Sequence, residues 1–218
     1  MKSKSIMDSL GLQKTSGYAH LMMNTGIIYF KKGDLENAID HYNKSLKIMD
    51  TIGFSNTSGY SNLMMNFGTV SFTKGDLKGA LEYYNKSRTI KEGLDLRGTS
   101  GYADLMMRTG IVYDRKGDLS AAAEYLEKST ALMDSLKLQR TSAYADLLMY
   151  SGIVTADKGD PASAMELLKK SAALMESLEL QTTSSYAELL MYCGIVSYGK
   201  GDLPGARDYL TRSAAVME

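Results

Sequence analysis

Few side chains in this sequence belong to the types that bind metals or attack substrates. The only histidines are His20 and His41, and Cys193 is the only cysteine. Neither histidine has a cysteine or carboxylate around it at the spacing of a metal site. Nothing in the sequence pairs Cys193 with a base that would activate its thiol. We therefore expect solvated or surface-lining histidines, a buried and unreactive thiol, and no metal or other cofactor.

Short motifs with a known catalytic mechanism are also missing. The sequence contains no phosphate-binding loop, no nucleophile elbow and no zinc-binding helix. Its carboxylates follow solvated helix faces rather than converging in pairs. The Asn-x-Ser/Thr sequons at Asn43, Asn56 and Asn85 are interpreted as chance matches, because no leader peptide precedes them. The sequence therefore predicts a protein that is not an enzyme.

The composition argues against several classes of partner. Lys and Arg number 25 and balance 25 Asp and Glu, so no basic field exists to attract nucleic acid or anionic lipid. No apolar run approaches the roughly 18 residues that a membrane span needs. A single cysteine cannot form an intrachain disulfide, and the first residues do not resemble a secretion signal. We expect a cytoplasmic protein that binds neither nucleic acid nor a membrane.

The feature that organises the chain is an internal repeat with a constant period of 42 residues. Tyr, Met and Gly each recur at a fixed column, as does the Lys-Gly-Asp triplet of residues 32–34. We define five repeats, with residues 1–10 as the end of a helix from a preceding repeat: 11–52, 53–94, 95–136, 137–178 and 179–218. Because each repeat can bury its apolar faces only against its neighbours, this period predicts a stacked array.

Each repeat is expected to form two amphipathic helices, which we call helix A and helix B. In the first repeat, Thr15 is expected to cap helix A, Gly33 to end it with a positive φ, and Asp34 to cap helix B. The small residues Gly26 and Ala38 are expected to face each other and to let the two helices approach closely. The predicted fold is all-α, an α-solenoid of stacked antiparallel helix pairs.

One pattern runs across both helices: Gly26-x-x-Tyr29-x-x-x-Gly33-Asp34-x-x-x-Ala38-x-x-x-Tyr42. It resembles the signature of the tetratricopeptide repeat (TPR) family, and the resemblance covers all five repeats. Met22 stands where the family has Trp, the terminal Pro is missing, and the period exceeds the usual length of about 34 residues. The chain is thus similar to a longer, 42-residue variety of TPR-like repeat. The resemblance implies a right-handed superhelix with helix A lining its concave face.

In the TPR register, one side of helix A forms the groove that would receive a partner. The Met column within it offers flexible thioethers suited to an adaptable surface, or else packs against the neighbouring helix A. The predicted groove residues are His20, Met23, Asn24, Ile27, Phe30 and Lys31; Asn62, Met65, Asn66 and Phe72; Asp104, Met107, Arg108, Asp114 and Arg115; Asp146, Met149, Tyr150 and Asp157; and Glu188, Met191, Tyr192 and Tyr198.

These residues differ among otherwise similar repeats, which predicts a function specific to this chain. The favoured function is a non-enzymatic scaffold that binds a protein or peptide in the helix A groove. The alternative is a structural array that associates end to end and has no dedicated ligand. The sequence ends within a helix B without a polar capping helix, and such ends are expected to be adhesive.

Overall fold

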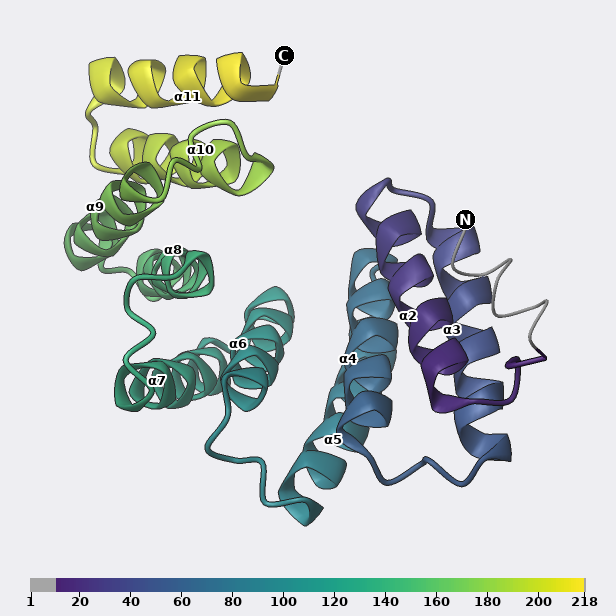
Figure 1. The fold of residues 1–218 in the computed structure, drawn as a ribbon. Coiled ribbons are helices and arrows are strands. Elements are labelled where there is room, and N and C mark those ends of the chain that lie inside the picture. The colour runs from purple at the N-terminus through teal and green to yellow at the C-terminus, as the bar shows by residue number, and fades with distance from the viewer. Residues whose placement is uncertain (1–10, 218) are drawn as a thin grey trace. The chain divides into compact units, whose positions relative to one another are not determined.

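The computed structural model describes residues 11–217, whose regular secondary structure consists of helices joined by short loops (Figure 1). It contains ten α-helices and no strand between residues 11 and 217, which confirms the predicted all-α class. Each of the five repeats contributes one helix A and one helix B. The helix expected for residues 1–10 lies outside the described residues.

The helices form two compact units, which meet in the chain between Arg97 and Gly98. In the first unit, helices A are α2 (Ser16–Lys31) and α4 (Ser58–Thr73), and helices B are α3 (Leu35–Thr51) and α5 (Leu77–Gly93). The contacts are those of a stacked array, because each helix A packs on its own helix B and α4 also packs on α2 and α3.

The second unit repeats this arrangement three times. Helices A are α6 (Ser100–Arg115), α8 (Ser142–Asp157) and α10 (Ser184–Gly199), and helices B are α7 (Leu119–Ser135), α9 (Pro161–Ser177) and α11 (Leu203–Met217). Within this unit α8 contacts both α6 and α10, so the three helices A form one continuous layer.

The helix ends follow the predicted capping chemistry. The Thr15 side chain accepts a hydrogen bond from the Tyr18 N–H at 3.3 Å, which satisfies one free donor at the start of α2. Gly33 has a φ of 78°, which a residue without a side chain adopts without steric cost. Asp34 then caps α3 by accepting from the Asn37 N–H at 3.1 Å. The predicted turn is therefore confirmed.

Close contact between helices A and B depends on the predicted small residues. A Cβ atom added to Gly26 would lie 2.5 Å from the Tyr42 ring and 3.0 Å from the Ala38 carbonyl oxygen. Ala38 itself is completely buried. Any larger side chain at Gly26 would therefore force the helices apart, which confirms the role predicted for this column.

In most repeats a buried serine of helix B forms a hydrogen bond with helix A of the same repeat. Its hydroxyl donates to a backbone carbonyl of helix A at 2.7–2.8 Å, as between Ser45 and the Ala19 oxygen. The second repeat departs from this pattern, because the buried Ser87 hydroxyl has no hydrogen-bond partner. The same serine thus bonds in four repeats and stands unpaired in the second.

No helix within residues 11–217 is both long and apolar enough to span a membrane.

Candidate partner-binding face

Four of the predicted groove methionines are core residues. Their exposed fractions are 7% for Met23, 7% for Met65, 6% for Met107 and 1% for Met149. Met23, Met107 and Met149 belong to three hydrophobic clusters that join neighbouring helices. The thioethers therefore pack between helices, which is the second of the two alternatives given for this column. Only Met191 on α10 keeps partial exposure.

The remaining predicted residues lie on helices A, and those of the first unit form a neutral to basic surface. Asn24 and Lys31 are exposed, Asn66 and Phe72 are half-buried, and Ile27 and Phe30 rest partly buried against the core.

Two further predicted residues of the first unit already have partners within the fold. The imidazole of His20 covers Gly59 of α4, so that a Cβ there would come within 2.5 Å of Nε2. The side-chain oxygen of Asn62 accepts from the buried Lys91 ammonium at 2.9 Å. Both residues therefore support packing as well as contributing to the surface.

The second unit presents a different surface, which we call the acidic face. It combines carboxylates, two arginines and two tyrosines from α6, α8 and α10: Asp104, Arg108, Asp114, Arg115, Asp146, Tyr150, Asp157, Glu188 and Tyr192. Arg108 Nε donates to both oxygens of Asp104, at 3.1 and 3.0 Å. This pair is about one-third exposed, so it lies in reach of a partner.

The centre of the acidic face is partly desolvated. Burial, assisted by the nearby charge of Glu188, raises the pKa of Asp146 to about 6 against the opposing effect of Arg108. Burial also raises the pKa of Tyr150 well above its usual range, again assisted by Glu188. Asp146, Tyr150 and Glu188 therefore lie near enough to influence one another electrostatically, as a cluster across the contacting helices α8 and α10.

A second part of the acidic face lies near the C-terminal ends of α6 and α8. Burial raises the pKa of Asp114, and the like charge of Asp157 adds to this shift while Arg115 opposes it. One Asp114 oxygen is buried without a hydrogen-bond partner. Carboxylates outnumber the arginines, so near neutral pH the whole face favours a positively charged partner.

The other candidate side chains have structural roles. His41 Nδ1 lies 2.8 Å from the Asn37 carbonyl oxygen, and its ring lies 5.0 Å from the Tyr29 ring. Cys193 is 1% exposed, and burial raises its thiol pKa to about 11, which confirms the expected buried thiol. Across residues 11–217, no group of His, Cys, Asp and Glu side chains has the arrangement of a metal site.

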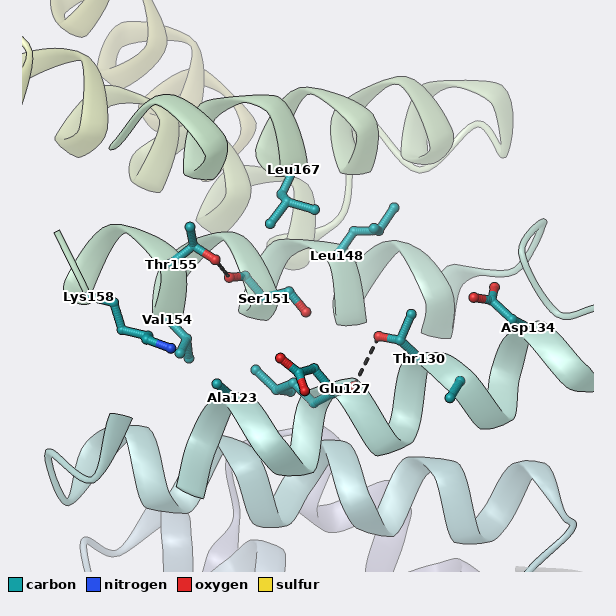
Figure 2. Close-up of a pocket in the computed structure, with 12 residues that line it drawn as sticks. Ala123, Glu127, Thr130, Asp134, Leu148, Ser151, Val154, Thr155, Lys158 and Leu167 are labelled. Atoms are coloured by element: carbon teal, nitrogen blue, oxygen red, sulfur yellow. Dashed lines mark hydrogen bonds between the residues drawn. The ribbon is translucent and has the colours of Figure 1, made fainter. Parts of the chain in front are cut away.

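Sequence reasoning missed one feature, a cavity of about 480 Å³ beside α8 (Figure 2). It is lined by α7, α8 and α9 and shares no residue with the acidic face. The available signal was a loss of side-chain size, since Ser151 occupies the column that holds Phe67 in the second repeat.

Comparison with known proteins agrees with the helix pairing. Residues 17–93 match the family model of the tetratricopeptide repeat. A comparison with curated protein sequences gives no significant match.

Several solved structures share the fold at low sequence identity. The nearly identical TPR-like repeats of a Podosopora anserina protein described as a kinesin light chain align with a TM-score of 0.68 at 13% identity, covering 92% of this chain and 95% of that one. BtubC (BKLC) from P. vanneervenii aligns with a TM-score of 0.75 at 13% identity, covering 99% and 85%.

A Rap protein complexed with competence and sporulation factor aligns with a TM-score of 0.77 at 15% identity, covering 91% of this chain. This chain spans only 54% of the Rap protein. At such identities the likeness concerns the fold alone. The helix pairs and these neighbours show that the described part of the chain has a TPR-like α-solenoid fold, and the tetratricopeptide repeat model matches residues 17–93 of it.

Proposed function

We propose that this protein is a non-enzymatic scaffold that binds a protein segment on its helix A surface, with the acidic face as the principal contact. The observation that carries the proposal is the cluster of half-buried Asp146, Tyr150 and Glu188 on adjoining helices. Desolvating carboxylates costs free energy, and nothing in the stacking of helix pairs requires charge at these columns. A partner that supplies positive charge would offset this cost.

The preferred partner is a basic peptide or a helix with basic residues on one side. Its Lys or Arg side chains would pair with Asp146, Glu188 and Asp104, while its apolar groups would pack on Tyr150 and Tyr192. Extended peptides and amphipathic helices are both recurring ligands of protein grooves. Among the structural neighbours, one Rap protein is complexed with competence and sporulation factor and another with the Phr* peptide, which supports a peptide ligand here.

A selection experiment with matched variants tests this proposal. A random peptide display library is panned against the protein, and the affinity of selected peptides is measured by fluorescence polarisation. The variant Asp146→Asn with Glu188→Gln removes two charges from the acidic face. The control, Glu124→Gln with Glu166→Gln, removes two charges from exposed positions on helices B. We expect the selected peptides to be basic and to bind the control variant as tightly as the wild type. They should bind the face variant at least tenfold more weakly, which is a loss of about 1.4 kcal/mol in binding free energy. Equal affinities for the two variants would refute the proposal.

A specific observation also favours the second candidate function, self-association. On α11 the side chains of Leu203, Leu210 and Met217 are 59%, 44% and 70% exposed. In the preceding repeats the column of Leu210 is filled by Leu126 and Leu168, which are 2% and 0% exposed. Light scattering over a concentration series tests this candidate: the Leu210→Lys variant should remain monomeric where the wild type associates.

A further inference from the structure

The cavity beside α8 opens at a seam between two consecutive repeats. Leu126 of α7, Leu148 and Val154 of α8 and Leu167 of α9 give it apolar walls. Figure 2 shows Leu167 pointing from α9 toward α8, and Glu127 pointing from α7 toward the same space. Its volume of about 480 Å³ lies in the range of about 300–1,000 Å³ typical of small-molecule sites.

The equivalent seam two repeats earlier, in the first unit, is filled by three aromatic rings. Tyr42 of α3 meets Phe67 of α4 edge-on, with ring centroids 5.5 Å apart. Phe67 in turn stacks on Tyr83 of α5, with centroids 5.3 Å apart. Phe67 is 7% exposed, so this seam is closed by its own side chains.

Residues at the three corresponding positions beside α8 carry no rings. Tyr42, Phe67 and Tyr83 correspond by the 42-residue period to Leu126, Ser151 and Leu167. Two further wall positions also carry a smaller or less apolar side chain than in the earlier seam. Ala123 corresponds to Ile39, and Thr130 corresponds to Leu46. The cavity therefore lies where the earlier seam holds aromatic rings, and the corresponding residues beside α8 supply none.

The threonine hydroxyls in the cavity wall are hydrogen-bonded to the backbone, so they leave the space mainly apolar. Thr155 donates its hydroxyl to the Ser151 carbonyl at 2.7 Å, and Thr130 donates to the Leu126 carbonyl at 3.0 Å. These two donors are already used by the backbone, so a ligand meets chiefly hydrocarbon there. Charge is confined to exposed Glu127, Asp134 and Lys158.

We propose that the cavity beside α8 binds a small planar aromatic molecule of one or two rings, which occupies the place that Phe67 and its neighbours take in the earlier seam. Burial of the ring faces against leucine and valine would supply the binding free energy. Apolar cavities of this kind take up aromatic molecules when the protein leaves them unfilled. The site shares no residue with the acidic face and is independent of the function proposed for that face.

Calorimetric titration of the full chain with indole tests the proposal. We expect one indole per chain and a rise in Tm with indole concentration. Ser151→Phe restores the ring of the earlier seam and should weaken binding more than tenfold. Ala123→Ile restores the isoleucine that the earlier seam has at this wall position and should weaken indole binding several-fold. This second variant keeps the test valid if Ser151→Phe does not fold. Glu124→Gln, on an exposed position of α7 outside the cavity wall, should leave binding unchanged.

Three results would overturn the assignment. The first is the absence of indole binding up to its solubility limit. The second is equal binding of indole by wild type, Ser151→Phe and Ala123→Ile. The third is binding of a tryptophan-bearing peptide without binding of free indole, which would make the cavity a pocket for a partner's side chain.

Discussion

The serine of helix B offers a test of the repeat architecture with a control inside the same unit. Ser45 and Ser87 are both completely buried and occupy the same column of successive repeats. The Ser45 hydroxyl donates to the Ala19 carbonyl at 2.8 Å, whereas the Ser87 hydroxyl has no partner. Replacing each by alanine therefore separates the hydrogen bond from the mere burial of a hydroxyl.

The expected difference follows from the net value of a hydrogen bond. Ser45→Ala loses a bond between helices and should lower the free energy of unfolding by about 0.5–1.5 kcal/mol. Ser87→Ala removes an unpaired buried hydroxyl, so it should be neutral or slightly stabilising. Both residues lie in the unit formed by α2–α5, so a difference in cooperativity between units does not affect the comparison.

Urea denaturation followed by circular dichroism measures this difference. Each variant is compared with the wild type at a common slope, and the midpoint shifts are converted to free energies. An equal loss in the two variants, or a larger loss for Ser87→Ala, would refute the account of how helices A and B are tied together.

Three further predictions follow from burial and close packing. Because burial raises the Asp146 pKa to about 6 in the folded state, the folded protein binds more protons than the unfolded chain between about pH 4 and 6, and stability falls as pH rises. Asp146→Asn should remove this dependence. The change that it causes in the free energy of unfolding should be about 1–2 kcal/mol more favourable at pH 8 than at pH 4, as measured by urea titrations at both pH values. Gly26→Ala should lower the free energy of unfolding by about 1–3 kcal/mol, because the added Cβ would lie 2.5 Å from the Tyr42 ring. Gly93→Ala on α5, where nothing lies within 4 Å of the added Cβ, should leave this free energy unchanged or raise it by up to about 1 kcal/mol. With its pKa raised to about 11, Cys193 should resist iodoacetamide at pH 8 in the native protein and react after unfolding.

The sequence predicts this fold well because its 42-residue period agrees with the residues that begin and end its helices. Thr15, Gly33 and Asp34 each have a local role that depends on a few neighbouring residues, so their types alone predict the helix ends. Gly26 and Ala38 were predictable for a similar reason, because close packing of two helices tolerates only small side chains at their crossing.

The face and the cavity were harder to predict because they depend on contacts between repeats. Met23 is apolar and lies near the predicted groove, but only the position of α4 shows that its side chain is covered. Asp146 was predicted as a groove residue, but its burial and the nearby charge of Glu188 depend on how α10 packs on α8. The cavity arises from several modest reductions in size, such as Phe67 to Ser151, that no single motif signals.

Hydrogen exchange measured with and without a selected basic peptide tests whether the helix A surface of the second unit is the binding site. We predict protection of the amides around Arg108, Tyr150 and Tyr192 on α6, α8 and α10. We also predict no change in the exposed parts of α7 and α9, which serve as internal controls. Protection confined to α7, α9 or α11, with the three helices A unchanged, would contradict the account.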